Sequence, residues 1–183
     1  MKYQIINTPL EDLVVIKPNF FSDERGGFLE SWNKKDFKSI GVNYKFKQDN
    51  HSISHKGVIR GLHFQTKPKE QSKLVRVVNG AVIDIVVDIR KKSKTFGQHF
   101  KIELSSLNKL MLMIPPGFAH GFISLENHTT FLYKCDEYYS PSHEKTLMWD
   151  DETINIDWEL NKLGISNPIL SPKDLKGIKF SDL

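Results

Sequence analysis

The sequence is short of cysteine, of long apolar runs and of clustered charge, and each shortage excludes a class of protein. A single cysteine, Cys135, among 183 residues rules out a disulfide within the chain and suits a reducing compartment. No run approaches the roughly 18 to 20 apolar residues of a membrane helix, and residues 1–7 lack the apolar core of an export signal. The net charge is only +4, from scattered lysines and arginines without interleaved aromatic residues. We therefore expect a cytoplasmic protein that binds neither membranes nor nucleic acid.

The chain is long enough for one domain with a sizeable core, and its apolar pattern predicts an all-β fold. Runs rich in β-branched and aromatic residues recur at roughly the 8–12-residue spacing of a sandwich or barrel. They cover residues 13–18, 58–65, 73–78, 81–89, 99–104, 109–114, 120–125 and 129–135. The Asn79-Gly80 pair between two of these runs predicts a β-hairpin at that point.

A few short helices and loops complete the predicted fold. Asn33, followed by Asp36, is typical of a helix start, and Gly41 is typical of a helix end, with Phe37 facing inward. After Trp149 the chain is acidic and then interrupted by proline and glycine, which argues against long elements. We expect residues 1–183 to form a single domain, with residues 150–183 as a loop-rich segment that packs back over the barrel.

The stretch at residues 48–65 is the densest in groups that can do chemistry, with three histidines, an arginine and two glutamines. If its second half is a strand, alternate residues share a face. Gly61, His63 and Gln65 would then point one way, and Arg60 and the apolar residues beside it would point the other. The polar face fits either the wall of a pocket or the solvent side of an exposed strand.

Two histidines lie in matching contexts, which favours a shared site. His63 follows Gly57 at the spacing of a turn and a strand, and His120 follows the Pro-Pro-Gly turn at 115–117. These spacings resemble the two motifs of the cupin family, a double-stranded β-helix or jelly-roll barrel that commonly binds a metal through histidines. Gln65 stands where a further ligand would be expected, and an amide is a poor ligand for such metals. We therefore predict no metal and expect the histidines to transfer protons, the alternative being two hydrogen-bonded core histidines.

Two further side chains fit proton transfer near a carbonyl group. Lys73 opens a strand whose inward face continues with Val75 and Val77, and a lysine there is costly unless it has a partner or a role. It could stabilise a developing enolate oxygen. Tyr133 shares a strand face with Phe131 and could donate a proton, although a core tyrosine bonded to the backbone is commoner.

An ordered set of motifs identifies a family resemblance along nearly the whole chain. The set comprises Phe21-Ser-Asp-Glu-Arg-Gly-Gly-Phe28, Gln48-Asp-Asn-His51, Arg60-Gly-Leu-His-Phe-Gln65, Lys73-Leu-Val-Arg76, Asp88-Ile-Arg90, Thr95-Phe-Gly97, Ile114-Pro-Pro-Gly-Phe-Ala-His-Gly-Phe122, Trp149-Asp-Asp151 and Asp157-Trp158. The sequence resembles the dTDP-4-dehydrorhamnose 3,5-epimerase family of the dTDP-L-rhamnose route. The most specific string is Arg-Gly-Leu-His-Phe-Gln at 60–65.

The resemblance implies a cofactor-free cupin that inverts C3 and C5 of a dTDP-linked 4-keto-6-deoxyhexose. By similarity, His63 is the base and Asp174, from the C-terminal segment, pairs with it. Tyr133 resembles the family's general acid, and Lys73 would lie near the carbonyl oxygen. Because abstraction and delivery occur on opposite faces of the sugar, the base and the acid must lie on opposite walls.

The same resemblance implies a nucleotide site and a homodimer. In the family the segment around Arg25 and Glu30 reaches into the neighbouring subunit's site, and a tyrosine at 138 or 139 could stack on the base. The predicted substrate-binding residues are Arg25, Glu30, Gln48, Asp49, Asn50, Arg60, His120, Tyr139, Glu144 and Lys173. Guanidinium groups suit the pyrophosphate because they donate parallel hydrogen bonds.

Three alternatives stay open on the sequence alone. A related enzyme could invert one centre only or act as a ketoisomerase on a similar nucleotide sugar. A metal-dependent cupin would need a divalent ion on His63 and His120. A sugar-nucleotide-binding module would use the same residues without turnover.

Overall fold

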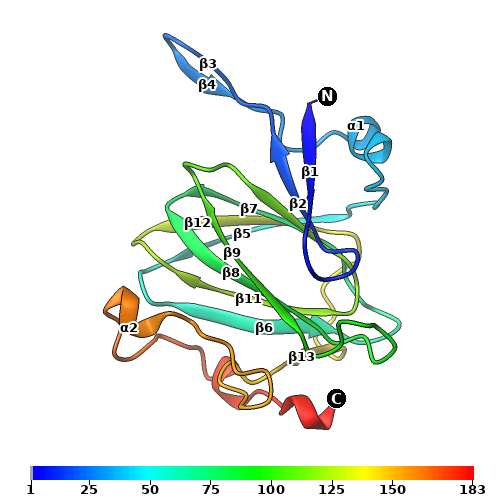
Figure 1. The fold of residues 1–183 in the computed structure, drawn as a ribbon, viewed down its shortest axis with the longest axis vertical. Helices are drawn as coiled ribbons and strands as arrows, with labels where there is room; N and C mark the ends of the chain where they lie inside the picture. Colours follow the sequence, from blue (N-terminus) through cyan, green and yellow to red (C-terminus); the bar gives the residue numbers. More distant parts are fainter. Residues whose placement is uncertain (1) are drawn as a thin grey trace.

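The computed structural model describes residues 2–183, and two antiparallel β-sheets dominate it (Figure 1). One sheet has six strands in the order β1-β2-β10-β7-β12-β5, and the other has five in the order β13-β6-β11-β8-β9. The strands are β1 (Tyr3–Asn7), β2 (Val14–Pro18), β5 (Gln48–Ser54), β6 (Ile59–Gln65), β7 (Lys73–Asn79), β8 (Ala81–Asp88), β9 (His99–Ser105), β10 (Met111–Ile114), β11 (Phe118–Ser124), β12 (Thr129–Cys135) and β13 (Glu144–Thr146). Two sheets whose strands are not paired in chain order match a jelly roll, so the all-β prediction is confirmed.

The main core lies between the two sheets. From the six-stranded sheet, Val75, Val77 and Phe131 point into it, and from the five-stranded sheet Val86 and Phe122 meet them. Successive strand residues point to opposite faces, so these positions recur at every second residue. The two inner faces therefore share one buried apolar layer.

Each sheet also buries part of its outer face. Helix α1 (Lys34–Ser39) places Phe37 against Ile16 and Met113 on the outer face of the six-stranded sheet. The C-terminal segment places Ile154 and Trp158 against the outer face of the other sheet. This double burial explains why all eight residues of β8 are buried, with alternate residues facing the core and the C-terminal segment.

The C-terminal segment is short pieces joined by loops, as its proline and glycine content predicts. It contains helix α2 (Leu160–Leu163) and two 3₁₀ turns, η1 (Asp174–Lys176) and η2 (Phe180–Asp182). Parallel bridges join Val58 to Ile169 and Leu147 to Ile178, which fix the segment beside β6 and β13. None of the helices within residues 2–183 is long and apolar enough to cross a membrane.

The helix predicted after Asn33 is confirmed. Helix α1 begins at Lys34, and the Asn33 side chain accepts hydrogen bonds from the backbone N–H groups of Lys35 and Asp36. This cap satisfies donors that have no partner inside the helix.

The hairpin predicted at Asn79-Gly80 is wrong. Strand β7 pairs with β10 and β12 in one sheet, whereas β8 pairs with β11 and β9 in the other. Asn79 itself pairs with Thr130 of β12, so it is not free to form a two-residue turn. Gly80, at φ +78°, lets the chain cross from one sheet to the other instead.

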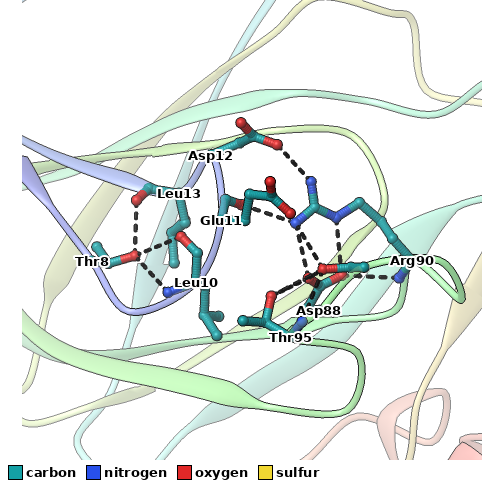
Figure 2. Close-up of polar contacts among 9 residues, drawn as sticks. Thr8, Leu10, Glu11, Asp12, Leu13, Asp88, Arg90 and Thr95 are labelled. Carbon is teal, nitrogen blue, oxygen red and sulfur yellow. Dashed lines mark hydrogen bonds and ion pairs between the residues drawn. The ribbon is translucent and has the colours of Figure 1, made fainter.

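An arginine at one end of the barrel ties distant segments together (Figure 2). Arg90 donates to both carboxylate oxygens of Asp88, at 3.0 and 2.8 Å, and to Asp12 at 2.8 Å. It also donates to the Glu11 carbonyl at 2.9 Å. The loop between β1 and β2 is thereby fixed to the end of β8, and the predicted motif Asp88-Ile-Arg90 has a structural role.

The remaining strands form an arm. β3 (Phe21–Asp23) and β4 (Gly26–Phe28) pair only with each other and extend away from the barrel (Figure 1). Phe21 and Phe28, opposite each other in this hairpin, are 60% and 68% exposed. Large aromatic side chains left this open are typical of a surface that another molecule covers.

Candidate active site

A cavity of about 430 Å³ opens between the two sheets. Both sheets contribute polar side chains to it, which separates it from the apolar core on the same inner faces. Its lining includes Gln48, Asn50, Ser52, Arg60, His63, Gln71, Lys73, His120, Phe122, Phe131, Tyr133, Cys135, Tyr139 and Glu144. Pockets with a few converging polar groups on a partly apolar wall are the usual form of a small-molecule site.

His63 lies on β6 and is paired with a carboxylate from the C-terminal segment. Its Nε2 is 2.5 Å from Asp174 Oδ1, and the Asp174 side chain is almost completely buried. The other oxygen, Oδ2, accepts from the Ser171 hydroxyl at 2.7 Å. Burial acts to raise the pKa of Asp174, but the hydrogen bonds from His63 and Ser171 outweigh it and lower that pKa.

The state of the histidine follows from this pairing. An ionised carboxylate only accepts hydrogen bonds, so the neutral His63 ring donates through Nε2–H and carries its lone pair on Nδ1. No hydrogen bond to Nδ1 is formed by any residue between 2 and 183. The ring thus offers a free base on a cavity wall, held in one tautomer by Asp174.

Tyr133 stands on the opposite sheet from His63. It lies on β12 with Phe131 and Cys135, and all three line the cavity, as the alternation of that strand predicts. Burial raises the pKa of the Tyr133 phenol, which therefore stays protonated at neutral pH. Its hydroxyl has no hydrogen-bond partner in the described part of the chain, so the backbone-bonded alternative does not hold.

Lys73 lies next to Tyr133 in the six-stranded sheet, because β7 pairs with β12 and Lys73 is opposite Cys135. Burial lowers the pKa of Lys73, and the nearby carboxylates of Glu144 and Asp84 oppose that shift. The ammonium group forms no ion pair within residues 2–183. Its amine is a hydrogen-bond donor without a fixed partner at the cavity wall.

A second histidine–carboxylate pair lies at the cavity, with His120 in its wall, and its acid was missed in the sequence. His120 Nε2 is 2.9 and 3.1 Å from the two oxygens of Asp84, which is fully buried. Burial raises the pKa of Asp84, and the bond to His120 opposes that change. Asp84 interrupts the apolar run from Ala81 to Val87, and the cost of burying a lone carboxylate was the signal that could have revealed it.

Arg60 shares the cavity with His63, contrary to the expected alternation. The register pairs His63 with His120 and Arg60 with Phe122, so three steps on β6 match two on β11. This bulge brings both β6 side chains to one face. Gly61, at φ +127°, permits it, since a Cβ there would lie 2.5 Å from the Gly121 Cα.

Gln65 does not line the cavity as the alternation predicted. It is buried, and its amide is bonded to backbone groups of two adjoining loops. An amide occupied in this way offers no ligand to a metal. Among residues 2–183, no three His, Cys, Asp or Glu side chains gather in a way that could hold a metal ion.

Most predicted nucleotide-binding residues surround one side of the cavity. Gln48 and Asn50 line it from β5, and Tyr139 bonds through its hydroxyl to Glu144 at 2.6 Å. Lys173 forms an ion pair with Glu144. These contacts join β5, β13 and the C-terminal segment around a single opening.

Lys173 and Asp174 meet the cavity only through their partners Glu144 and His63, and three other predicted residues lie away from it. Asp49 lies on the outer face of β5, where it pairs with Lys134 at 2.6 Å, because it alternates with Gln48 and Asn50. Arg25 lies in the exposed β3–β4 hairpin and pairs with Asp23 at 2.6 Å. Glu30 follows that hairpin, and its carboxylate accepts hydrogen bonds from Lys2, from Tyr3 of β1 and from Asn33, the N-cap of α1.

Gln71 and Ser52 also line the cavity and were not singled out in the sequence. Ser52 follows Gln48 and Asn50 on the same face of β5, and its hydroxyl is buried without a hydrogen-bond partner in the described chain. Buried hydroxyls are normally satisfied, so this one is open to a ligand. The period of two along β5 was the signal that could have found it.

Comparison with known proteins places these residues in a family. The family model described as dTDP-4-dehydrorhamnose 3,5-epimerase matches residues 7–182. A curated relative of that name from Salmonella typhimurium is 50% identical over 93% of this chain and 91% of its own.

Solved structures agree with the sequence match. A Bacillus anthracis dTDP-4-dehydrorhamnose 3,5-epimerase, with TDP and PPi bound, has a TM-score of 0.92 and 44% identity, covering 97% of this chain and 99% of its own. The Legionella pneumophila dTDP-6-deoxy-D-glucose-3,5-epimerase, in complex with dTDP-4-keto-L-rhamnose, has a TM-score of 0.92 and 43% identity, covering 98% and 93%. The predicted cupin-type jelly roll is confirmed by this likeness. The chain belongs to the dTDP-4-dehydrorhamnose 3,5-epimerase family, whose members are isomerases.

Proposed function

We propose that this protein inverts C3 and C5 of dTDP-4-dehydro-6-deoxy-D-glucose to give dTDP-4-dehydro-L-rhamnose. The observation that carries the proposal is the arrangement of an Asp174-paired His63 on one sheet and an unbonded Tyr133 on the facing sheet, with Lys73 beside the tyrosine. A base and an acid on opposite walls are what inversion at a carbon requires. The family match supplies the substrate class.

Each inversion proceeds through an enolate. The 4-keto group acidifies the hydrogens on C3 and C5, and His63 Nδ1 removes one of them. The C–H electron pair forms the C=C bond while the carbonyl pair moves onto O4, where the Lys73 ammonium stabilises the negative charge. Tyr133 then donates its phenolic proton to the same carbon from the other face, and the C=O bond reforms. Exchange with solvent removes the proton from His63 and returns one to Tyr133.

Asp174 makes the first step feasible. When His63 takes the proton it becomes a cation, and the adjacent carboxylate stabilises that charge. Asp84 holds the His120 ring through Nε2 in one orientation at the cavity wall. We assign Asp84 as a positioning residue for this reason.

The nucleotide half of the substrate has its own proposed contacts. Arg60 donates to the pyrophosphate, Gln48 and Asn50 bind the thymidine part, and Tyr139 stacks on the base. His120, Glu144 and Lys173 complete that side of the site. Tyr139 is 52% exposed, so its ring is open to a stacking partner.

A second copy of the chain completes the site in this proposal. Arg25 and Glu30 lie in or beside the extended arm, away from their own cavity, and the arm exposes Phe21 and Phe28. An arm that docks on a partner would bury these rings and carry Arg25 to the partner's pyrophosphate. Mixing Arg25→Ala with His63→Asn chains tests this, since only a shared site regains activity from two inactive parents.

Two broader predictions from the sequence remain part of the proposal. The chain acts as one domain, with residues 150–183 contributing Asp174 to the barrel site. A reducing cytoplasm, where sugar nucleotides are made and used, is the proposed location.

The reaction itself is tested by deuterium uptake. The protein is incubated with dTDP-4-keto-6-deoxyglucose in heavy water, and the product is followed by NMR and mass spectrometry. Uptake at both C3 and C5 with inversion supports the double epimerase. Uptake at one carbon only identifies a single-centre enzyme, and binding of dTDP without any uptake would overturn the catalytic assignment.

A further inference from the structure

The wall of the cavity that carries Tyr139 is built from irregular chain. Residues 136–143 connect β12 to β13 without forming a helix or strand. Surface loops of this kind are more mobile than the strands they join. If the Tyr139 ring is to stack on a nucleotide base in one orientation, other residues must hold this loop in place.

Glutamine side chains from three other segments hold this loop by its backbone. Gln71 donates to the Glu137 carbonyl at 2.8 Å, and Gln48 accepts from the Tyr139 N–H at 2.9 Å. Gln65 hydrogen-bonds to the backbone of the residues directly before and after Tyr139, and it is the only one of the three glutamines that is buried. Gln48 and Gln71 also face the cavity, whereas Gln65 does not.

The contacts of Gln65 use its whole amide group. Nε2 donates to the Tyr138 carbonyl at 3.2 Å and to the Lys69 carbonyl at 2.5 Å. Oε1 accepts from the Ser140 N–H at 2.7 Å. Two donors and an acceptor on one short planar group are properties of an amide alone, because a carboxylate has no donor and an aliphatic chain has neither.

We propose that Gln65 is a positioning residue that acts through Tyr139, by fixing residues 138–140 so that the Tyr139 ring is oriented for the nucleotide base before substrate arrives. The inference rests on the proposed function, in which Tyr139 stacks on that base. An unfixed loop would have to be ordered on binding, and that ordering would weaken affinity without touching the groups that move protons. Gln65 therefore contributes to nucleotide affinity from a position that the substrate does not contact.

The test compares dTDP affinity and turnover in four variants and one control. Gln65→Met keeps the length of the side chain and removes all three hydrogen bonds, while Gln65→Glu keeps the acceptor and places an oxygen against two carbonyls. Tyr139→Ala removes the ring itself, alone and combined with Gln65→Met. Thr66→Val is the matched control, because the Thr66 hydroxyl bonds only to the His143 carbonyl at the far end of the same loop, and the Thr66 backbone N–H keeps its own bond to that carbonyl.

We expect Gln65→Met to raise the Kd for dTDP and the KM by about five- to tenfold, with kcat within about twofold, the scale of ordering a side chain and its loop. Gln65→Glu should lose at least as much, and Thr66→Val should bind dTDP like the wild type. The double variant should bind no more weakly than Tyr139→Ala, since the ring through which Gln65 acts is already gone.

Three results would overturn the inference. In the first, Gln65→Met binds dTDP like the wild type. In the second, the loss of dTDP affinity from Gln65→Met adds fully to the loss from Tyr139→Ala. In the third, Gln65→Met lowers kcat and leaves dTDP affinity unchanged. Each leaves the proposed function standing if the wild type binds dTDP. A wild type that does not bind dTDP would overturn the proposed function and this inference together. Thermal melts of every variant show whether a weaker affinity comes from a loss of folding or from a loss of the Tyr139 orientation. Gln65→Glu serves as a second substitution at the same position if Gln65→Met does not fold.

Discussion

Replacing Asp174 with asparagine should slow proton abstraction about a thousandfold while preserving the shape of the site. Asp174 Oδ1 lies 2.5 Å from His63 Nε2, and asparagine Oδ1 can still accept that hydrogen bond. What is lost is the negative charge that stabilises the imidazolium. Because both charges are spread over their groups, their effective separation is about 4 Å, and at an effective dielectric constant of about 20 the attraction is about 4 kcal/mol. At about 1.4 kcal/mol per factor of ten, this corresponds to about 10³ in rate.

The assay is the initial rate of deuterium uptake at C3 and C5 under saturating substrate. Asp174 does not line the cavity, so the Kd for dTDP should stay within about threefold of the wild-type value. Ser171→Ala is the graded control, because it keeps the carboxylate and removes the 2.7 Å bond to its second oxygen together with the 3.2 Å bond from the Asp174 N–H, and it should cost about tenfold or less. An Asp174→Asn enzyme that keeps more than a tenth of the wild-type rate would refute the assignment of His63 as an ion-paired base.

Three other substitutions have distinct expected outcomes. In the same uptake assay, Lys73→Met should lower kcat by about 10² to 10³, the usual loss for one group that stabilises an oxyanion. The control is Lys134→Met, on the outer face of the neighbouring strand, which should leave kcat unchanged. Tyr133→Phe should exchange substrate hydrogen for deuterium with retention more than it epimerises, since His63 can still remove and return a proton on its own face; equal losses of both would contradict separate acid and base roles. Burial opposes the ionisation of Asp88, yet hydrogen bonds from its arginine, serine and threonine partners lower its pKa to about 2. The ionised Asp88 therefore contributes its full stabilisation above the unfolded-state pKa of about 4, and this contribution is lost as pH falls towards 2. We expect the difference in unfolding free energy between the wild type and Asp88→Asn to shrink by about 2 kcal/mol from pH 6 to pH 2, as measured by urea unfolding.

Local patterns in the sequence predicted elements whose causes are themselves local. Asn33 caps a helix because its side chain reaches N–H groups two and three residues ahead. The alternation along 129–135 correctly placed Phe131, Tyr133 and Cys135 on one face, since that strand keeps its period at these positions. Motif resemblance identified His63 and Asp174 as partners, which spacing alone could not do across 111 residues.

The features that the sequence did not predict correctly depend on contacts between segments that are distant in the chain. Asn79-Gly80 has the composition of a hairpin, but the pairing partners of the flanking strands lie elsewhere in the chain, and they determine which sheet each strand joins. Arg60 changed face because β11 opposes β6 with one residue fewer. Asp84 was overlooked because its partner, His120, is 36 residues away.

The position of Asp174 in the chain has a consequence for biosynthesis. The last barrel strand, β13, ends at Thr146, whereas the carboxylate that activates His63 arrives with η1 at Asp174. During translation the barrel can assemble, cavity included, while the ribosome still encloses the segment that carries this carboxylate. A nascent chain would thus have the barrel strands before it has the activity, and proteolytic removal of the same segment would take away both this carboxylate and the side chains that cover the outer face of the five-stranded sheet.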